Sequence, residues 1–485
     1  MEVFVTISKS RQNIPVWLVR ALPLSAALAL ALALGPVSMY VVPAMLAFSF
    51  LVWISFAYPE RMFLFAFGCS ILVSVEIGVK WGTLPRIGLS LFVLAALLLG
   101  ASLHLGWHFD REQIADMFAR VPMIRLWGAY ILFLLVSAAL SIDRQASYYS
   151  VFKQILLQFA LILLLCHFMR DPRFWPRLRA VIYVATAVAC LYAVAEEITH
   201  YNIFISQYPM EEPLMRDGLL RVRSTFFHPI AFGTYLALVY PFIAADVIKR
   251  RRLILITLLF LLLTAMFLTA SRGPWVALIV ETAILAFSLV RSKSRMLGAV
   301  IVIVCLFTCL AGLKNVMWPG SNHTETFTNL NALNSAQIDE ASSEYYRIAV
   351  VRASLQSLEG WRWIYGCGPG TFYMADVRSD YARQEHVLSA GDCQYALSLV
   401  EVGTVGLGLL LLMTVTGMLI CIQAVRRTLG SSKLLAYACL ASVMGFVIGC
   451  ATASMLLLFP LNLLFWMAII LASRVQRTRI PEEQL

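Results

Sequence analysis

Long apolar stretches recur along the chain and are separated by short polar segments. About 20 apolar residues in a helix cross a hydrocarbon layer of ~30 Å, so each stretch predicts a membrane-spanning helix. A closed β-barrel would instead need short strands of alternating polarity. The pattern predicts an all-α, polytopic transmembrane protein with about 12 to 14 spans. The expected spans are roughly 21–35, 37–57, 62–79, 86–106, 122–141, 150–168, 177–196, 228–247, 253–270, 273–290, 296–314, 395–424, 434–453 and 456–474.

One long polar segment, at about 315–394, interrupts this pattern. Residues 321–337 are rich in Asn, Thr and Ser, which predicts irregular structure. From 339 to 358 apolar residues recur at helical spacing, with Arg347 and Arg352 beside the apolar stripe. We expect a long loop that contains short helices.

Basic clusters between the spans predict the orientation, because cytoplasmic loops carry an excess of Lys and Arg. The clearest clusters fall within 170–179, 249–252, 291–295, 426–433 and 474–479. With a cytoplasmic N-terminus, alternating spans place all of these clusters in the cytoplasm, together with the C-terminus. The same alternation places 197–227 and 315–394 on the outer side, although Lys80 and Arg86 also fall there.

This alternation divides the chain into four regions. We expect N-terminal transmembrane helices in 1–200 and further transmembrane helices in 201–314, with a short outer loop at 197–227. The long outer loop follows at 315–394. Residues 395–485 hold the last transmembrane helices and a short cytoplasmic tail. The first apolar run has no small-residue cleavage site, so we expect it to remain as an uncleaved helix.

Composition narrows the class of protein. Apolar residues make up 60% of the chain and charged residues 13%, too few charges for the surface of a soluble globule. The net charge of +11 comes from loop clusters rather than a basic domain, so we expect no nucleic-acid partner. The cysteines form no CxxC or mixed Cys/His spacing, so no metal site is predicted. Cys367 and Cys393 fall in the outer segment, where a disulfide is one alternative.

Arginines near the predicted outer membrane face are candidates for binding an anion. Arg272, in Ser271-Arg272-Gly273, stands where one span ends and the next begins. A guanidinium suits phosphate oxygens, although a helix-end anchor is the alternative. Arg347 and Arg352 are five residues apart, so at most one of them would face a given ligand on a helix. A solvated basic face is the other interpretation of this pair.

The outer loop at 197–227 and the entry to the next span add Arg223 and His228, which could line the approach of an anionic lipid head group. A merely solvated loop is the alternative. Asp392 lies just before a span and Glu401 lies inside it. Each could act as a general base or order the arginines, and Asp392 could equally be a solvated helix cap.

Glycines follow in Gly366-x-Gly-x-Gly-Thr-Phe. Their spacing is not a nucleotide-binding fingerprint. They predict a backbone that turns tightly against neighbouring helices.

Several motifs in order resemble the O-antigen ligase and polymerase family of bacterial envelope enzymes. The order is Ser224-Thr225-Phe226-x-x-Pro229 with Pro241 in the next span, Ser271-Arg272-Gly273, Tyr346-Arg347, Gly366-x-Gly-x-Gly-Thr-Phe, and Gln394-Tyr395 followed by Glu401-x-Gly403-x-x-Gly406. The resemblance covers roughly residues 215–425, under half of the chain.

The resemblance implies a metal-independent glycosyltransferase without a cofactor in the bacterial inner membrane. It implies that a glycan carried on undecaprenyl diphosphate is transferred, at the periplasmic face, to an acceptor glycan. Arg272 and Arg347 would hold the diphosphate. With Asp392 as base or acceptor orienter, these form the predicted catalytic set. Arg223, His228, Arg352 and Glu401 form the predicted substrate-binding set.

The chain departs from the family pattern at one position. Ligases of this family carry a His-Asn pair nine residues before the glutamate, where this chain has Asp392-Cys393. The imidazole is therefore absent there, and His386 is a candidate substitute. The departure favours a polymerase of exopolysaccharide or O-antigen repeat units over an O-antigen ligase that acts on a lipid core.

Other classes of function stay open. A transporter or flippase for the lipid-linked glycan would place charged residues around a midplane cavity, whereas these arginines lie at one face. A non-catalytic scaffold of an envelope complex is a further alternative. In every case membrane lipid is a partner, and polysaccharide export proteins are candidate partners.

Overall fold

A computed structural model of the chain describes residues 38–73, 78–79, 87–108, 122–204, 215–216, 219–289, 351, 354–372, 374, 393–430, 432–456 and 458–477. The chain divides into two compact units, Met1–Ile114 and Ala115–Leu485.

The first unit contains three described helices and one short hairpin. The helices are α3 (Ser38–Ala57), α4 (Pro59–Leu72) and α5 (Leu89–His108), and β1 (Gly78–Val79) pairs antiparallel with β2 (Ile87–Gly88). α3 packs against α5, where a Cβ on Gly100 would lie 2.4 Å from the Ser55 Cβ. Small residues at this contact let the two backbones approach closely, as is typical of helix pairs in membranes.

The second unit begins with α7 (Pro122–Ala139). One continuous helical stretch follows, in which α8 (Arg144–Gln154) passes through a π-helical turn, η2 (Ile155–Ala160), into α9 (Leu161–Phe168). After α10 (Phe174–Thr199), β3 (Met215–Arg216) pairs antiparallel with β4 (Leu219–Leu220). The remaining helices are α11 (Pro229–Arg250), α12 (Leu253–Leu268), α13 (Arg272–Leu289), α17 (Arg362–Tyr365), α19 (Gln394–Arg427), α20 (Ser432–Cys450) and α21 (Leu461–Arg477).

These helices confirm the all-α, polytopic prediction. Every predicted span coincides with a helix, except 21–35 and 296–314, which lie outside the described residues. Three boundaries differ by five residues or more: α4 ends at Leu72 rather than near 79, α8 begins at Arg144 rather than 150, and α21 begins at Leu461 rather than 456. The predicted surface helix at 339–358 lies mostly outside the described residues.

Among the described residues, five helices are long and apolar enough to cross a membrane. They are Arg144–Phe168, Phe174–Thr199, Pro229–Arg250, Gln394–Arg427 and Ser432–Gly449. Further apolar helices of 10–17 residues include parts of α7, α12 and α21. The chain is therefore a multi-pass membrane protein.

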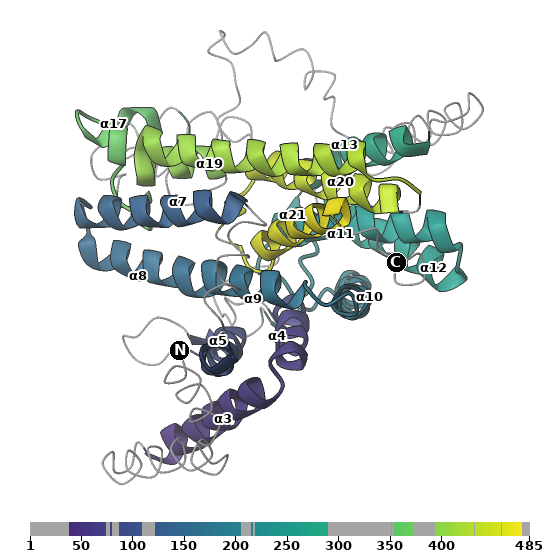
Figure 1. The fold of residues 1–485 in the computed structure, drawn as a ribbon, viewed down its shortest axis with the longest axis horizontal. Helices are drawn as coiled ribbons and strands as arrows, with labels where there is room; N and C mark the ends of the chain where they lie inside the picture. Colours follow the sequence, from purple (N-terminus) through teal and green to yellow (C-terminus); the bar gives the residue numbers. More distant parts are fainter. Residues whose placement is uncertain are drawn as a thin grey trace, which may run out of the picture. The chain divides into compact units, whose positions relative to one another are not determined.

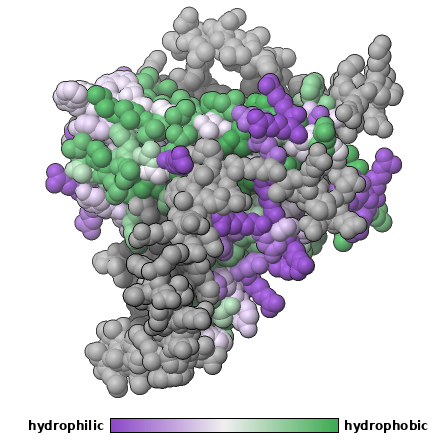
Figure 2. All heavy atoms as spheres, in the orientation of Figure 1, coloured by the Kyte–Doolittle hydropathy of each residue, from purple (hydrophilic) through white to green (hydrophobic). Residues whose placement is uncertain are grey.

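α11 forms the centre of the second unit. It is buried on all sides, by α12, α13, α20 and α21. Away from this centre, α19 runs alongside α7, and α8 lies on the other side of α7 (Figure 1). Apolar residues gather over α7 and the neighbouring part of α19, while hydrophilic residues gather on the side where α12 lies (Figure 2). The lipid-facing surface and the core are thus both apolar, so packing and hydrogen bonds must select the fold.

Candidate functional site

Two segments that carry predicted site residues, 221–228 and 268–272, are hydrogen-bonded to each other at one end of the helices. The Val222 N–H donates to the Leu268 carbonyl over 3.1 Å. Beside it, the Arg221 Nη2 donates to the Ser271 Oγ over 3.1 Å. Ser271 is buried and its hydroxyl donates in turn to the Thr269 carbonyl over 3.0 Å. Because Ser271 precedes Arg272, this bond holds a second guanidinium at the start of α13.

Arg272 is the first residue of α13 and is exposed. The residue after it, Gly273, lies so close to Thr452 that a Cβ would meet the Thr452 Oγ1 at 2.7 Å. The predicted catalytic arginine therefore stands between the 221–228 segment and the connection from α20 to α21.

Two residues in these segments have left-handed backbone conformations, Ser224 with φ 55° and Ala270 with φ 47°. Such residues cost about 1–2 kcal/mol each and persist where neighbouring contacts fix them. At Ser224 the N–H donates to the Glu196 Oε2 at 2.7 Å, and the hydroxyl donates to the Ala189 carbonyl at 2.6 Å. The Asn202 amide donates to the Ser224 carbonyl at 2.8 Å. These hydrogen bonds fix the strained turn at Ser224, and strained residues of this kind cluster at functional sites.

Glu196 is the residue that organises this turn, and the sequence analysis did not single it out. Its carboxylate is buried at the end of α10 and also accepts from the Arg223 N–H at 3.3 Å. A carboxylate at the end of an apolar helix was the available sequence signal. Its backbone partners lie 27 and 28 residues away, so only the fold reveals them.

Arg223 and His228, both predicted to bind substrate, lie in this same segment. Arg223 is buried, and its Nη1 donates to the Phe227 carbonyl over 3.4 Å. The His228 side chain caps α11 by accepting at Nδ1 from the Ile230 N–H over 3.2 Å. The imidazole is half-buried.

Burial, and then the charges of Arg221 and Arg223, lower the pKa of His228 to about 4. His228 is therefore neutral at pH 7. Since Nδ1 accepts a hydrogen bond, its proton resides on Nε2, where it can be donated. Arg221, Arg223 and the His228 N–H thus supply hydrogen-bond donors to one region.

The glycine-rich segment at 366–372, here called the glycine loop, packs against a break in α19. The break is at Gly403, with φ 65°. The break leaves the backbone carbonyls of Val400 and Glu401 available to partners outside the helix. The Val400 carbonyl accepts from the Cys367 N–H at 2.7 Å, and the Glu401 carbonyl accepts from the Gly368 N–H at 2.8 Å. The buried Glu401 carboxylate accepts from the Phe372 N–H at 3.3 Å. In the structure Glu401 therefore holds the glycine loop, and its predicted contact with substrate stays a prediction.

The other side of the glycine loop meets the turn between α7 and α8. The Cys367 carbonyl accepts from the Ile142 N–H at 3.0 Å. A Cβ on Gly368 would lie 2.0 Å from the Ser141 Oγ, and one on Gly366 would lie 2.3 Å from the Glu401 carbonyl carbon. The prediction that these glycines let backbone turn tightly against neighbouring helices is confirmed.

Gln394 and Tyr395 join the start of α19 to the connection from α20 to α21 and to α20 itself, respectively. The Gln394 Oε1 accepts from the Leu456 N–H at 3.0 Å, and the Tyr395 hydroxyl donates to the Val447 carbonyl at 3.0 Å. The same connection contacts Gly273 through Thr452. One short connection therefore touches both the neighbour of Arg272 and Gln394, which lies two residues after Asp392.

The other predicted site residues, Arg347, Arg352 and Asp392, lie outside the described residues, as does His386. Cys367 and Cys393 are both free thiols in the structure.

With this geometry in place, residues 257–411 match the family described as O-antigen ligase. This match supports the resemblance to the O-antigen ligase/polymerase-related family over about a third of the chain. The match begins in α12 and ends in α19, and it includes Arg272, the glycine loop and Glu401. No curated protein matched the chain. The similarity supports, at a general level, a ligase or polymerase type of glycosyl transfer from a lipid-linked glycan to an acceptor.

Proposed function

We propose that the protein is a membrane glycosyltransferase that polymerises or transfers oligosaccharide linked to undecaprenyl diphosphate, at the periplasmic face of the bacterial inner membrane. A polymerase of exopolysaccharide or O-antigen repeat units is the favoured form. The observation that carries the proposal is the Arg221–Ser271 hydrogen bond of 3.1 Å, because it holds the Arg221 guanidinium beside Arg272. Arg272 itself lies within the region that matches the family.

The proposed reaction breaks one bond and forms another at the anomeric carbon of the donor glycan. The hydroxyl oxygen of the acceptor forms a bond to this carbon, and the bond from the carbon to the phosphate oxygen breaks. Negative charge then grows on the leaving diphosphate. Fixed cations at that position stabilise the transition state more than the ground state.

Arg272 and Arg221 are proposed to bind the diphosphate together, with Arg347 as the further predicted ligand. Guanidinium groups pair well with phosphate oxygens because their donors form a planar fork. Arg223 and the His228 Nε2–H are proposed as donors to the sugar or to the phosphate. Asp392 is proposed to take the proton from the acceptor hydroxyl.

An O-antigen ligase that uses a lipid core as acceptor is the second candidate. The family match supports both forms, whereas Asp392 at the usual histidine position favours the polymerase. A flippase for the same glycan is the rival from another class.

Purified full-length protein, incubated with lipid-linked oligosaccharide, separates these candidates. We expect glycans of two or more repeat units, detected as longer products by mass spectrometry, with no added acceptor. Product that forms only when lipid core is supplied would identify a ligase. Movement of the glycan across a vesicle membrane without any new glycosidic bond would identify a flippase and refute the proposal.

A further inference from the structure

Exposed aromatic side chains gather at the short helix α17. Trp361, the residue just before α17, is 73% exposed, and Trp363 within the helix is 38% exposed. Ile364, beside them, is 42% exposed. A group of large exposed apolar side chains marks a surface that contacts a membrane or another partner.

Hydrogen bonds to two longer helices fix the position of α17. The Thr404 hydroxyl of α19 donates to the Trp363 carbonyl at 2.8 Å. The Ser137 hydroxyl of α7 donates to the Tyr365 carbonyl at 2.7 Å. In Figure 1, α17 lies at the end of α19 where α7 turns into α8. The exposed tryptophans therefore belong to one end of this group of helices.

α19 shows where this end lies relative to the lipid. The exposed large apolar side chains beyond Thr404 on α19 are Val405, Leu411, Leu412, Val415 and Leu419. Exposed polar side chains follow at Gln423, Arg426 and Arg427. Thr404 and Arg426 are 22 residues apart on α19, about 33 Å at 1.5 Å per residue, close to the ~30 Å of a hydrocarbon layer. α17 therefore lies at one edge of a lipid-facing stripe, and the arginines lie at the other.

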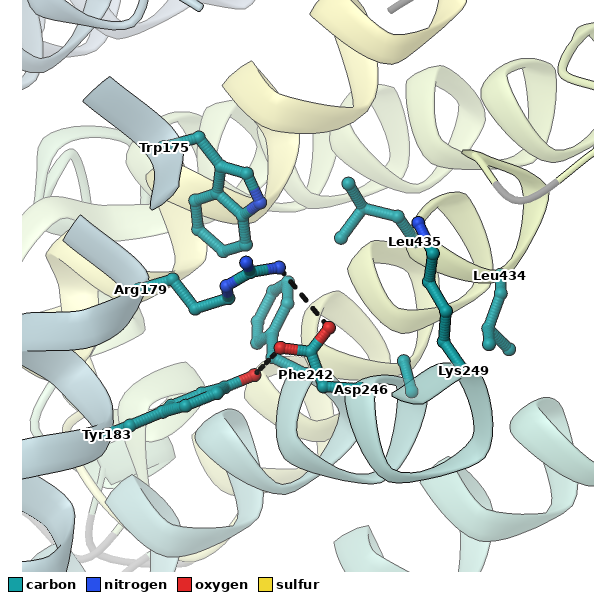
Figure 3. A pocket seen from close by; sticks show the side chains of 9 residues that line it. Trp175, Arg179, Tyr183, Phe242, Asp246, Lys249, Leu434 and Leu435 are labelled. Carbon is teal, nitrogen blue, oxygen red and sulfur yellow. Dashed lines mark hydrogen bonds and ion pairs between the residues drawn. The ribbon is translucent and has the colours of Figure 1, made fainter. Parts of the chain in front are cut away.

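An ion pair marks the same face as Arg426. The Asp246 carboxylate, near the end of α11, lies 3.2 Å from the Arg179 Nη1 and accepts from the Tyr183 hydroxyl at 3.0 Å (Figure 3). The start of α20 lies beside both places, because it lines one cavity with Asp246 and another with Arg426. Charged groups thus collect at this face, whereas the exposed tryptophans lie at the opposite face.

Tryptophan suits the boundary between hydrocarbon and head groups. Its indole combines a large apolar ring with an N–H donor, so one part can lie among acyl chains while the other meets polar groups. Arg362, between the two tryptophans, is half-buried, and its long side chain can reach the head-group water from this depth.

We propose that α17 is inserted in the head-group layer of the membrane, where Trp361 and Trp363 anchor it. The orientation predicted from the basic clusters makes this the outer leaflet. The glycine loop begins at Gly366, the residue after α17, so the anchor fixes the depth of that loop at the membrane surface. This part of the predicted outer loop then contacts lipid instead of extending into water.

The test measures the depth of Trp361 in the full-length chain, reconstituted in phosphatidylcholine vesicles. The chain has 11 tryptophans, so the emission of Trp361 is taken as the difference between the wild type and Trp361→Phe. The vesicle lipid carries bromine, which quenches nearby indoles, either close to the head group or near the end of the acyl chain. We expect the shallow bromine to quench Trp361 at least about twofold more strongly than the deep bromine.

Trp127→Phe is the matched control, because Trp127 is fully buried in α7, which packs against α19. The emission of Trp127 should show no preference for the shallow bromine. Trp363→Phe provides the same measurement at the second anchor if Trp361→Phe does not fold.

Stronger quenching of Trp361 by the deep bromine would overturn the proposal, as would an equal shallow preference at Trp127. Quenching of Trp361 by iodide in the water, with no effect of either brominated lipid, would also overturn it. If a soluble oligosaccharide then relieved the iodide quenching, the tryptophans would form a glycan-binding surface instead.

Discussion

Ser271 connects two arginines that are far apart in the sequence. Its buried hydroxyl accepts from Arg221 and lies one residue before Arg272. A guanidinium that is fixed before substrate arrives loses less conformational entropy on binding than a mobile one. If Arg221 and Arg272 bind the diphosphate as proposed, the hydroxyl is expected to affect activity without touching the reacting atoms.

Ser271→Ala tests this positioning role. We expect kcat/KM for glycan transfer to fall about tenfold, equivalent to about 1.4 kcal/mol, because Arg221 loses its acceptor. The free energy of unfolding should change by only about 1 kcal/mol. Ser288→Ala is the control, since the Ser288 hydroxyl donates to the Leu285 carbonyl near the other end of α13. Equal activity in the two variants would contradict the role of Ser271.

His228 predicts a pH dependence of stability. Its pKa is about 4 in the folded protein, against an ordinary value of 6.5. Above pH 6.5 the imidazole is neutral in both states, so its contribution is complete. As the pH falls from 6.5 to 4, the unfolded chain binds a proton and the folded protein does not. The free energy of unfolding should therefore fall, by up to about 3 kcal/mol.

His228→Asn isolates this effect, because asparagine caps helices well and does not titrate in this range. Thermal unfolding is measured from pH 7 to pH 4 for both proteins. The wild type should lose more stability on acidification than the variant. Parallel curves would show that His228 is not the titrating group.

At the scale of elements, the glycine loop and the broken helix α19 depend on each other. The loop supplies N–H donors to Val400 and Glu401, whose carbonyls are available because the helix breaks at Gly403. Neither element has a complete set of backbone hydrogen bonds alone. A side chain between them should therefore disturb both.

Gly366→Ala is expected to destabilise the protein by about 2 kcal/mol or more. The residue has φ 79°, and an added Cβ would lie 2.3 Å from the backbone of Glu401. Gly408→Ala in the same helix α19 is the matched control, since its Cβ would meet nothing within 4 Å. Alanine there should be neutral or should stabilise the helix by up to about 1 kcal/mol. Equal unfolding temperatures for the two variants would contradict this account.

At the scale of the whole molecule, the apolar pattern predicted the helices well, because a membrane requires long helical stretches whatever their neighbours. Boundaries were less predictable: α21 begins only after Pro460, although the apolar run starts earlier. Arg223 and His228 could be proposed from their place in one outer segment. The role of Glu196 could not, because its backbone partners come from another segment, and Glu401 likewise meets Phe372 only in the fold.

The central claim is that Arg272 binds the diphosphate of a lipid-linked glycan during transfer. Arg272→Ala, purified and incubated with lipid-linked oligosaccharide, tests it most directly. Arg252→Ala, which changes an exposed arginine just before α12, serves as the control. We predict that Arg272→Ala loses about 100-fold or more in kcat while it keeps its unfolding temperature, and that Arg252→Ala stays near the wild type. Undiminished glycan transfer by a folded Arg272→Ala protein would contradict the account.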